Sequence, residues 1–302
     1  MGARKKRVVA LGFFDGVHMG HSALLARAKE QAALLGATPS VLTFDPHPRQ
    51  FTTGERVPLI NTLSDRVELI QRLHGIDDLL VIPFSEALRR MPWPEFLVLL
   101  QKKFHAVHLV CGHDFQFGYG GAGHSEELRE KCAQLGIGCD VIPEISLDGV
   151  PVSATHIRRL LMAGDMAQAN RFLGRPHILT ERVVHGHKLG QTIGVPTINM
   201  HVPQEVLTPA HGVYVSRVFL PDEQEGHMAI TNIGVRPTLE EANPVIVESH
   251  ILAFDADLYN RQVRVEFYHF LRPERKFQNM RELKAQILRD IDGARAYFSV
   301  SG

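Results

Sequence analysis

Two histidines near the amino terminus, His18 and His21, are spaced like a phosphate-handling pair in "LGFFDGVHMGHSALLARAKEQAALLG". Their imidazoles can donate hydrogen bonds to phosphate oxygens and to the charge that develops during group transfer. Gly16 and Gly20 let a phosphate approach the backbone, because glycine has no side chain to block it. The pattern predicts a nucleotide triphosphate site. Solvated or capping histidines are the plain alternative, and a zinc site would need a third ligand.

A second chemical segment is "GHKLGQTIGVPTIN", in which Gly186, Gly190 and Gly194 fall within nine residues. A glycine-rich loop can lie close over phosphates, although no G-K-[ST] closes this one as in a Walker A loop. If the end of the segment is a strand, Thr197 and Asn199 share one face and offer two neutral oxygen ligands for Mg²⁺. A β-turn followed by an ordinary polar strand face is the alternative.

Composition limits the partners. Lys+Arg and Asp+Glu both number 33, so the formal net charge is zero, and a polyanion such as nucleic acid is not expected as a partner. No apolar run approaches the roughly 20 residues that span a bilayer, and the basic start lacks a small-residue cleavage site. Cys111, Cys132 and Cys139 have no C-x-x-C spacing and are expected to be small buried thiols. We expect a cytoplasmic protein without membrane contact.

The pattern of predicted helices and strands, which must position these residues, changes near Gly174. Before it, short β-rich apolar runs alternate with amphipathic helical patterns, which predicts a parallel sheet with helices on its faces. The expected strands are 7–14, 39–44, 79–84, 106–112 and 139–144, and the expected helices are 22–36, 63–75, 93–104 and 125–136. The first domain is therefore expected to cover residues 1–174.

The second domain is expected to cover residues 175–302. Its helical patterns almost vanish, and β-rich runs are separated by turn-rich segments, which predicts an antiparallel barrel or sandwich. The expected strands are 177–186, 212–220, 227–234, 244–254 and 261–271, and residues 279–298 predict a closing helix. Two helical pieces within 153–175 are expected to bridge the domains.

In this arrangement the two histidines lie between the first strand and the first helix, at the carboxyl edge of the sheet. Ligands of open α/β folds bind at that edge. The helix amino terminus adds unpaired N–H groups and a positive partial charge, which favours phosphate.

"GFFDGVHMGH" resembles the phosphate-binding signature of the H-x-G-H nucleotidyltransferases, in the version found in bacterial bifunctional riboflavin kinase/FAD synthetases. Further matching stretches follow in order: "LTFDPHPRQF", "CGHDFQFGYGGAGH", "VSATHIRRLL", and "GQTIGVPTIN" with "NIGVRPTL". The resemblance covers nearly the whole chain. It implies a Rossmann-like α/β nucleotidyltransferase domain, then an antiparallel β-barrel domain with a carboxyl-terminal helix.

For the first domain the resemblance implies transfer of an adenylyl group from ATP to FMN. His18 and His21 would hold the ATP phosphates and stabilise the transition state. Other residues implied to bind ATP or its phosphates are Gly12, Phe13, Asp15, Gly20, Ser153, Thr155 and Arg158. The family usually has a second serine where this chain has Ala154. That hydroxyl is worth about 1–3 kcal/mol if it contacts phosphate, and nothing if it points into the core.

"HDFQFG" is implied to line the flavin pocket, with Asp114 as a polar contact and Phe115 or Phe117 as a wall. A buried strand end with core aromatics is the alternative. Asn61 and His47 are further flavin candidates, although "DPHPRQF" equally fits a proline-shaped loop. The glycines between 118 and 123 predict a mobile loop.

For the second domain the resemblance implies phosphorylation of riboflavin. Glu248 is implied to be the base that accepts the proton of the 5′-hydroxyl, and Arg272 to belong to a flavin-contacting segment. A solvated glutamate and a surface arginine are the alternatives. Leu189 stands where many relatives carry an arginine, so the resemblance does not extend to the phosphate contact of that arginine.

The sequence therefore predicts an enzyme that makes FMN from riboflavin and then FAD from FMN, with Mg²⁺ and ATP in both steps. Its partners are expected to be small-molecule substrates, and the chain to be a monomer or a weak homo-oligomer. Three alternatives remain: a riboflavin kinase with a weakened first domain, a nucleotidyltransferase for another phosphorylated alcohol such as phosphopantetheine, and a non-catalytic flavin-binding protein.

Overall fold

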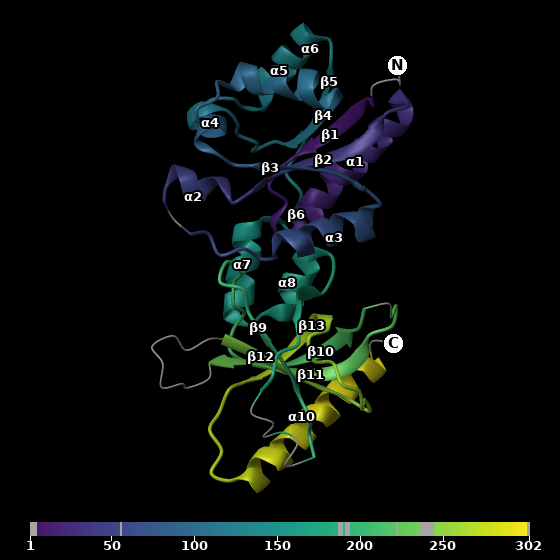
Figure 1. The fold of residues 1–302 in the computed structure, drawn as a ribbon, viewed down its shortest axis with the longest axis vertical. Helices are drawn as coiled ribbons and strands as arrows, with labels where there is room; N and C mark the ends of the chain where they lie inside the picture. The colour runs from purple at the N-terminus through teal and green to yellow at the C-terminus, as the bar shows by residue number, and fades with distance from the viewer. Residues whose placement is uncertain are drawn as a thin grey trace. The chain divides into compact units, whose positions relative to one another are not determined.

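The computed structural model describes residues 5–54, 56–186, 190, 194–221, 223–235 and 245–300. The chain divides into two compact units, residues 1–154 and 155–302 (Figure 1). In the described part, no helix is both long enough and apolar enough to cross a membrane.

The first unit is built on a five-stranded parallel sheet with the order β3-β2-β1-β4-β5. The strands are β1 (Arg7–Leu11), β2 (Thr38–Asp45), β3 (Asp78–Pro83), β4 (Ala106–Gly112) and β5 (Gly138–Ile142). Because β1 and β4 are neighbours, the winding of the sheet reverses at β1. Such a switch point leaves a crevice at the carboxyl ends of the strands. The predicted parallel sheet is confirmed.

Helices connect these strands (Figure 1). They are α1 (Met19–Leu35), α2 (Pro48–Thr52), α3 (Leu63–His74), α4 (Glu86–Arg89), α5 (Trp93–Phe104) and α6 (Ser125–Leu135). Their limits follow local rules: Thr62 caps the start of α3 by accepting from the backbone N–H of Asp65, and Gly36 and Gly136 end α1 and α6 in the left-handed conformation. A short hairpin, β6 (Ser146–Leu147) and β7 (Val150–Pro151), follows.

The core of this unit lies between the sheet and its helices. Leu11, Leu97, Leu109 and Leu128 belong to one buried cluster on β1, α5, β4 and α6. Cys111 and Cys132 are buried in the same cluster, and Cys139 packs against it half-buried. The expectation of small buried thiols therefore holds for two cysteines and only partly for the third.

The second unit is a nearly closed, six-stranded antiparallel barrel with the order β8-β13-β10-β11-β12-β9. The strands are β8 (His177–Arg182), β9 (Ile198–His201), β10 (Gly212–Phe219), β11 (His227–Val235), β12 (Val245–Ile251) and β13 (Gln262–Pro273). A bridge between Val184 and Asn199 brings the two edge strands together. The predicted barrel is confirmed.

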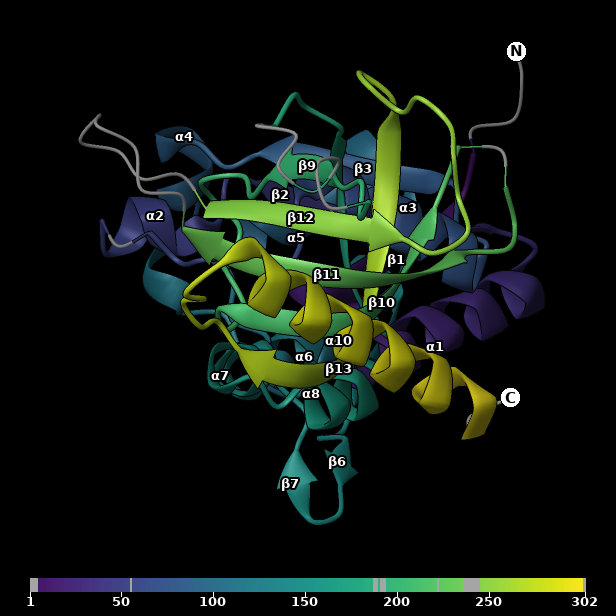
Figure 2. The same ribbon diagram turned by 90° about the horizontal axis from the view of Figure 1, so that it is seen from below.

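Helices flank the barrel. They are α7 (Ala154–Ala163), α8 (Met166–Leu173) and α10 (Met280–Val300). Figure 2 shows α10 lying across β10 and β11, where Ile291 and Ala294 pack on Val215 and Ile230. The predicted closing helix is therefore confirmed.

The compact units divide at 154/155, so α7 and α8 are grouped with the barrel. Asn170 of α8 shows why: its Nδ2 donates to the carbonyl of Phe267 at 2.8 Å, and its Oδ1 accepts from the backbone N–H of His177 at 2.8 Å. The boundary at 174/175 stays a prediction of where the two functions divide.

Candidate active sites

His18 and His21 lie where β1 passes into α1, as the sequence predicts. His18 is the N-cap of α1, and its Nδ1 accepts the backbone N–H of His21 at 3.3 Å. The two rings stack with centroids 3.6 Å apart and planes 15° apart. Because Nδ1 of His18 accepts, the neutral ring carries its proton on Nε2. Gly20 permits this arrangement, since a Cβ there would lie 3.2 Å from the His18 ring.

His21 is uncharged at neutral pH. Burial lowers its pKa well below the usual value, and the neighbouring His18 and the guanidinium of Arg66 lower it further. Its Nδ1 is buried and has no hydrogen-bond partner among the described residues. His21 is thus a neutral ring with one polar atom unsatisfied.

The loop that presents these histidines has an unusual backbone. Phe14 and Val17 both have positive φ, 61° and 40°, in addition to Gly16 at 77°. A bulky or β-branched side chain in this region costs of order 1–3 kcal/mol, so surrounding contacts must hold it there. Strain of this kind is concentrated at ligand-binding loops.

Asp15 supplies part of that support. Its side chain is 3% exposed, and its Oδ1 accepts from the backbone N–H groups of Ile60 (2.9 Å) and Asn61 (3.4 Å). Asp15, predicted at the phosphates, therefore anchors the loop to the segment before α3. Asn61, predicted at the flavin, is 1% exposed beside this anchor.

Arg66 is a functional candidate that the sequence analysis missed. Its side chain is completely buried, and its Nη1 donates to the carbonyl of Phe13 at 2.6 Å. The guanidinium lies 4.1 Å from the centroid of the Phe13 ring. The signal was present in the sequence, since Arg66 falls on the same helical stripe as Leu69 and Ile70. Phe13, which was predicted at the phosphates, accepts the hydrogen bond from Arg66 through its backbone carbonyl.

Ser153 directly precedes α7, and Thr155 and Arg158 lie in its first two turns. Val152, the residue before Ser153, lies near the loop of His18 and His21, because its carbonyl oxygen is 3.7 Å from where a Cβ of Gly20 would lie. Ala154 is the first residue of α7 and is half-buried. Thr155 and Arg158 belong to the second compact unit. Their grip on the triphosphate stays a prediction.

A cavity of about 430 Å³ lies beyond the carboxyl ends of β2 and β4. Phe115 and Phe117, both predicted at the flavin, line it and stack with ring centroids 5.5 Å apart. Gly118 also lines it with φ of 75°, and a Cβ there would lie 2.4 Å from that of Trp93. Asp114 is exposed and is not among the described residues that line this cavity.

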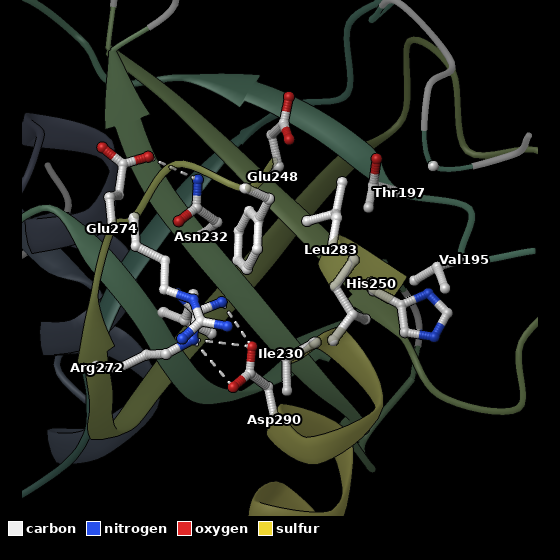
Figure 3. A pocket seen from close by; sticks show the side chains of 15 residues that line it. Val195, Thr197, Ile230, Asn232, Glu248, His250, Arg272, Glu274, Leu283 and Asp290 are labelled. Carbon is white, nitrogen blue, oxygen red and sulfur yellow. Dashed lines mark hydrogen bonds and ion pairs between the residues drawn. The ribbon is translucent and has the colours of Figure 1, made fainter. Parts of the chain in front are cut away.

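The barrel of the second unit holds another cavity, of about 250 Å³ (Figure 3). Four of the predicted residues line it: Gly190, Thr197, Glu248 and Arg272. Its polar side chains, including Glu248, come from β11, β12, β13 and α10, and its apolar side chains, such as Leu283, come from β10, β11 and α10. Polar and apolar side chains therefore both line the cavity (Figure 3).

Asn199 differs from the expected arrangement. β9 begins at Ile198, so Thr197 precedes the strand and strand alternation does not place it. Asn199 pairs with Glu248 across β9 and β12 but is 5% exposed. A Cβ on Gly186 would lie 2.4 Å from Asn199 Nδ2, so this glycine makes room for the amide.

Arg272 is held rather than free. Its Nε and Nη2 bind both carboxylate oxygens of Asp290 at 2.7–3.1 Å, and Gln286 also donates to Asp290 at 2.7 Å. Glu274, two residues later, accepts from Asn232 Nδ2 at 3.1 Å. Asp290, Asn232 and Glu274 were missed because their partners are distant in the sequence.

A third cavity, of about 270 Å³, shares Thr197 with the Glu248 cavity. Ser249, Asp255, Asp257 and Tyr259 contribute to its walls. The sequence signal was "FDADLYN", which directly follows the strand that carries Glu248. Thr197 thus lies where two cavities of the barrel unit meet.

Within the described ranges, no group of three or more His, Cys, Asp and Glu side chains could hold a metal ion. The oxygen donors of Thr197, Asn199 and Glu248 suit a hard cation that keeps waters and phosphate ligands, as Mg²⁺ does. Gly194 is exposed with φ of 78°. Leu189 lies outside the described residues, so the glycine loop is placed only in part.

Comparisons with known proteins match each of the two units. Residues 2–156 match the family model described as FAD synthetase, and residues 173–298 match that described as riboflavin kinase. The chain is 34% identical to a bifunctional riboflavin kinase/FMN adenylyltransferase of Listeria monocytogenes, over 97% of this chain and 93% of the relative. It is 37% identical to that of Pseudomonas fluorescens, over 96% and 92%. A solved structure from Streptococcus pneumoniae titled a macrolide-efflux protein has a TM-score of 0.86 and 27% identity, over 98% and 95%.

Proposed function

The chain belongs to the bifunctional riboflavin kinase/FMN adenylyltransferase family, and we propose that each compact site described above carries one of the two activities. The protein is an enzyme with an FAD synthetase domain and a riboflavin kinase domain, and its family implies ATP and a divalent metal. One observation carries the assignment: the residues matched by each family model include one of the two candidate sites. Residues 2–156 contain the stacked histidines, and 173–298 contain the Glu248 cavity.

In the kinase unit, riboflavin occupies the Glu248 cavity. Its flat ring system packs against Ile230 and Leu283, and its ribityl chain points to Glu248. Glu248 accepts the proton of the 5′-hydroxyl as that oxygen attacks the γ-phosphorus of ATP, and ADP leaves. Arg272, fixed by Asp290, forms part of the wall beside the flavin.

ATP of the kinase reaction enters from the neighbouring cavity. Because Thr197 borders both cavities, a nucleotide beside Tyr259 directs its phosphates toward Glu248. Thr197 and Asn199 would hold Mg²⁺ there, and the ion supplies positive charge to the phosphates when it is bound. The glycines of the loop leave space for the phosphates.

In the first unit, a phosphate oxygen of FMN attacks the α-phosphorus of ATP, and pyrophosphate leaves. Little covalent help is needed, so positioning and charge stabilisation supply the rate. Nε2–H of His18, neutral His21 and the amino terminus of α1 donate to the phosphates. The isoalloxazine ring lies in the cavity of Phe115 and Phe117. Ser153 contacts the triphosphate.

The test is a time course with riboflavin, ATP and Mg²⁺, in which riboflavin, FMN and FAD are separated by chromatography. FMN should appear first and FAD after it. If FMN accumulates and added FMN is left unconverted, the chain is a riboflavin kinase with an inactive first domain, and Ala154 is the first residue to test as the cause.

Two variants separate the sites. Glu248→Gln should lower riboflavin phosphorylation at least about 100-fold, because a general base contributes that much or more, and should leave FAD formation from added FMN unchanged. His21→Ala should do the reverse. Each activity serves as the folding control for the other, and loss of both activities in a folded variant would contradict independent sites.

A further inference from the structure

Arg66 is a charged side chain with no exposed surface, which is unusual in a protein core. Arg66 belongs to α3 of the first unit. The Arg66 guanidinium contacts both the loop before α1 and the end of β2. We infer that Arg66 is a positioning residue of the adenylyltransferase site, which holds the 12–18 loop so that His18 and His21 face the phosphates. This inference rests on the proposed function and deepens it.

The contacts of Arg66 converge on one peptide. The carbonyl of Phe13 accepts from Arg66 Nη1 at 2.6 Å and from Thr43 Oγ1 at 2.9 Å. Arg66 Nη2 lies 3.4 Å from the carbonyl of Phe44, and the guanidinium covers the Phe13 ring. Phe13 directly precedes Phe14, the first residue with positive φ. The doubly bound carbonyl therefore fixes the peptide at which the loop turns.

Core packing does not require an arginine here. Burial lowers the pKa of the guanidinium because it loses hydration, and Asp15 and Asp45 only partly oppose this. Its Nε has no hydrogen-bond partner among the described residues. A buried charge with incomplete partners is usually less stable than an apolar side chain of the same volume. Arg66 therefore serves the loop rather than the core.

Arg66 also acts on His21 through its charge. The groups that face His21 are the stacked His18 ring, the Arg66 guanidinium and the Phe14 ring. Around them, His47 packs on Phe13, and His74 lies near Ser22. Burial is the main cause of the low pKa of His21, and the nearby His18 and the Arg66 guanidinium lower that pKa further. Removing the Arg66 charge should raise the pKa of His21 toward its usual value.

The experiment compares Arg66→Met, Arg66→Lys and, as a matched control, Arg72→Met on the exposed face of α3. Steady-state FAD synthesis from FMN and ATP is measured against pH, and riboflavin phosphorylation is measured on the same samples. The fluorescence of Trp93, the single tryptophan of the chain, reports the folding of the first unit.

Arg66→Met should lower kcat/KM for FAD synthesis about 100-fold, the usual effect of moving catalytic groups by about 1 Å. The acidic limb of its pH profile should move to higher pH. Arg66→Lys keeps the charge but not the fork that spans two carbonyls, so its rate should fall while its pH limb stays in place. Arg72→Met and the kinase activity should not change.

The inference fails if Arg66→Met, or Arg66→Lys where the Met variant does not fold, retains wild-type kcat/KM for FAD synthesis. It fails equally if the Met and Lys variants show the same pH limb and the same rate loss, because Arg66 is then only a core residue. Failure of wild-type protein to convert FMN to FAD would instead refute the proposed function, so the two failures are distinguishable.

Discussion

The barrel unit should lose stability in acid because His177 is buried without a charge. The side chain is 2% exposed on β8, and its Nδ1 has no partner among the described residues. Burial, with a smaller contribution from Arg175, lowers the pKa of His177 from 6.5 to about 3. Below pH 6.5 the His177 imidazole of the unfolded chain therefore binds a proton, whereas that of the folded chain stays neutral until the pH approaches about 3.

The sign and size of the effect follow from proton linkage. Stability from His177 is fully present above pH 6.5 and is lost as the pH falls from 6.5 toward 3. At pH 5 the gap of 1.5 units to the unfolded pKa corresponds to about 2 kcal/mol, at 1.36 kcal/mol per unit. His177→Leu removes this loss, and the backbone bond from residue 177 to Asn170 Oδ1 remains available.

The assay is urea unfolding at pH 7 and pH 5, followed by tyrosine absorbance, since Tyr214, Tyr259, Tyr268 and Tyr297 lie in this unit. Wild-type protein should lose about 2 kcal/mol more than His177→Leu between the two pH values. His211→Leu, a change at an exposed histidine of the same unit, is the control and should behave like wild type. Equal losses in wild type and His177→Leu would refute the reasoning.

Two further predictions concern the walls of the flavin cavities. Asp290→Asn should raise the KM for riboflavin about tenfold, because Arg272 loses one charge-assisted partner worth about 1.4 kcal/mol. FAD formation from added FMN should stay unchanged. An unaltered KM for riboflavin would show that Arg272 does not shape this site. Gly118→Ala should weaken FMN use and shift Trp93 emission, because its Cβ would lie 2.4 Å from Trp93 and because φ of 75° with ψ of −175° is a conformation that essentially only glycine adopts. Gly120→Ala, at φ of 66° and ψ of 11° with open space around it, should have a smaller effect, and equal effects of the two alanines would contradict this prediction.

Hydrophobic periodicity was enough to predict a parallel sheet with helices in the first unit and an antiparallel barrel or sandwich in the second, and the family resemblance then indicated the barrel. Alternation of strand and helix patterns leads to a parallel sheet because each element buries a face that its neighbours in the chain can cover. The place of His18 and His21 also follows locally, since a helix start is determined by the residues around it. Glu248 and Thr197 were found through motifs, and the structure brings them to one cavity.

Only the tertiary structure decided what those residues touch. Arg66 finds Phe13 at a separation of 53 residues, Asp15 finds Ile60 at 45, and Arg272 finds Asp290 at 18. Each pairing depends on the packing of elements distant in the sequence, which local propensity and spacing do not specify. The loop contacts of Asp15 were not expected, its predicted place at the phosphates stays a prediction, and Arg66 was not expected at all. The sequence determined which elements form and where their chemistry lies, and long-range packing determined which side chains hold that chemistry in place.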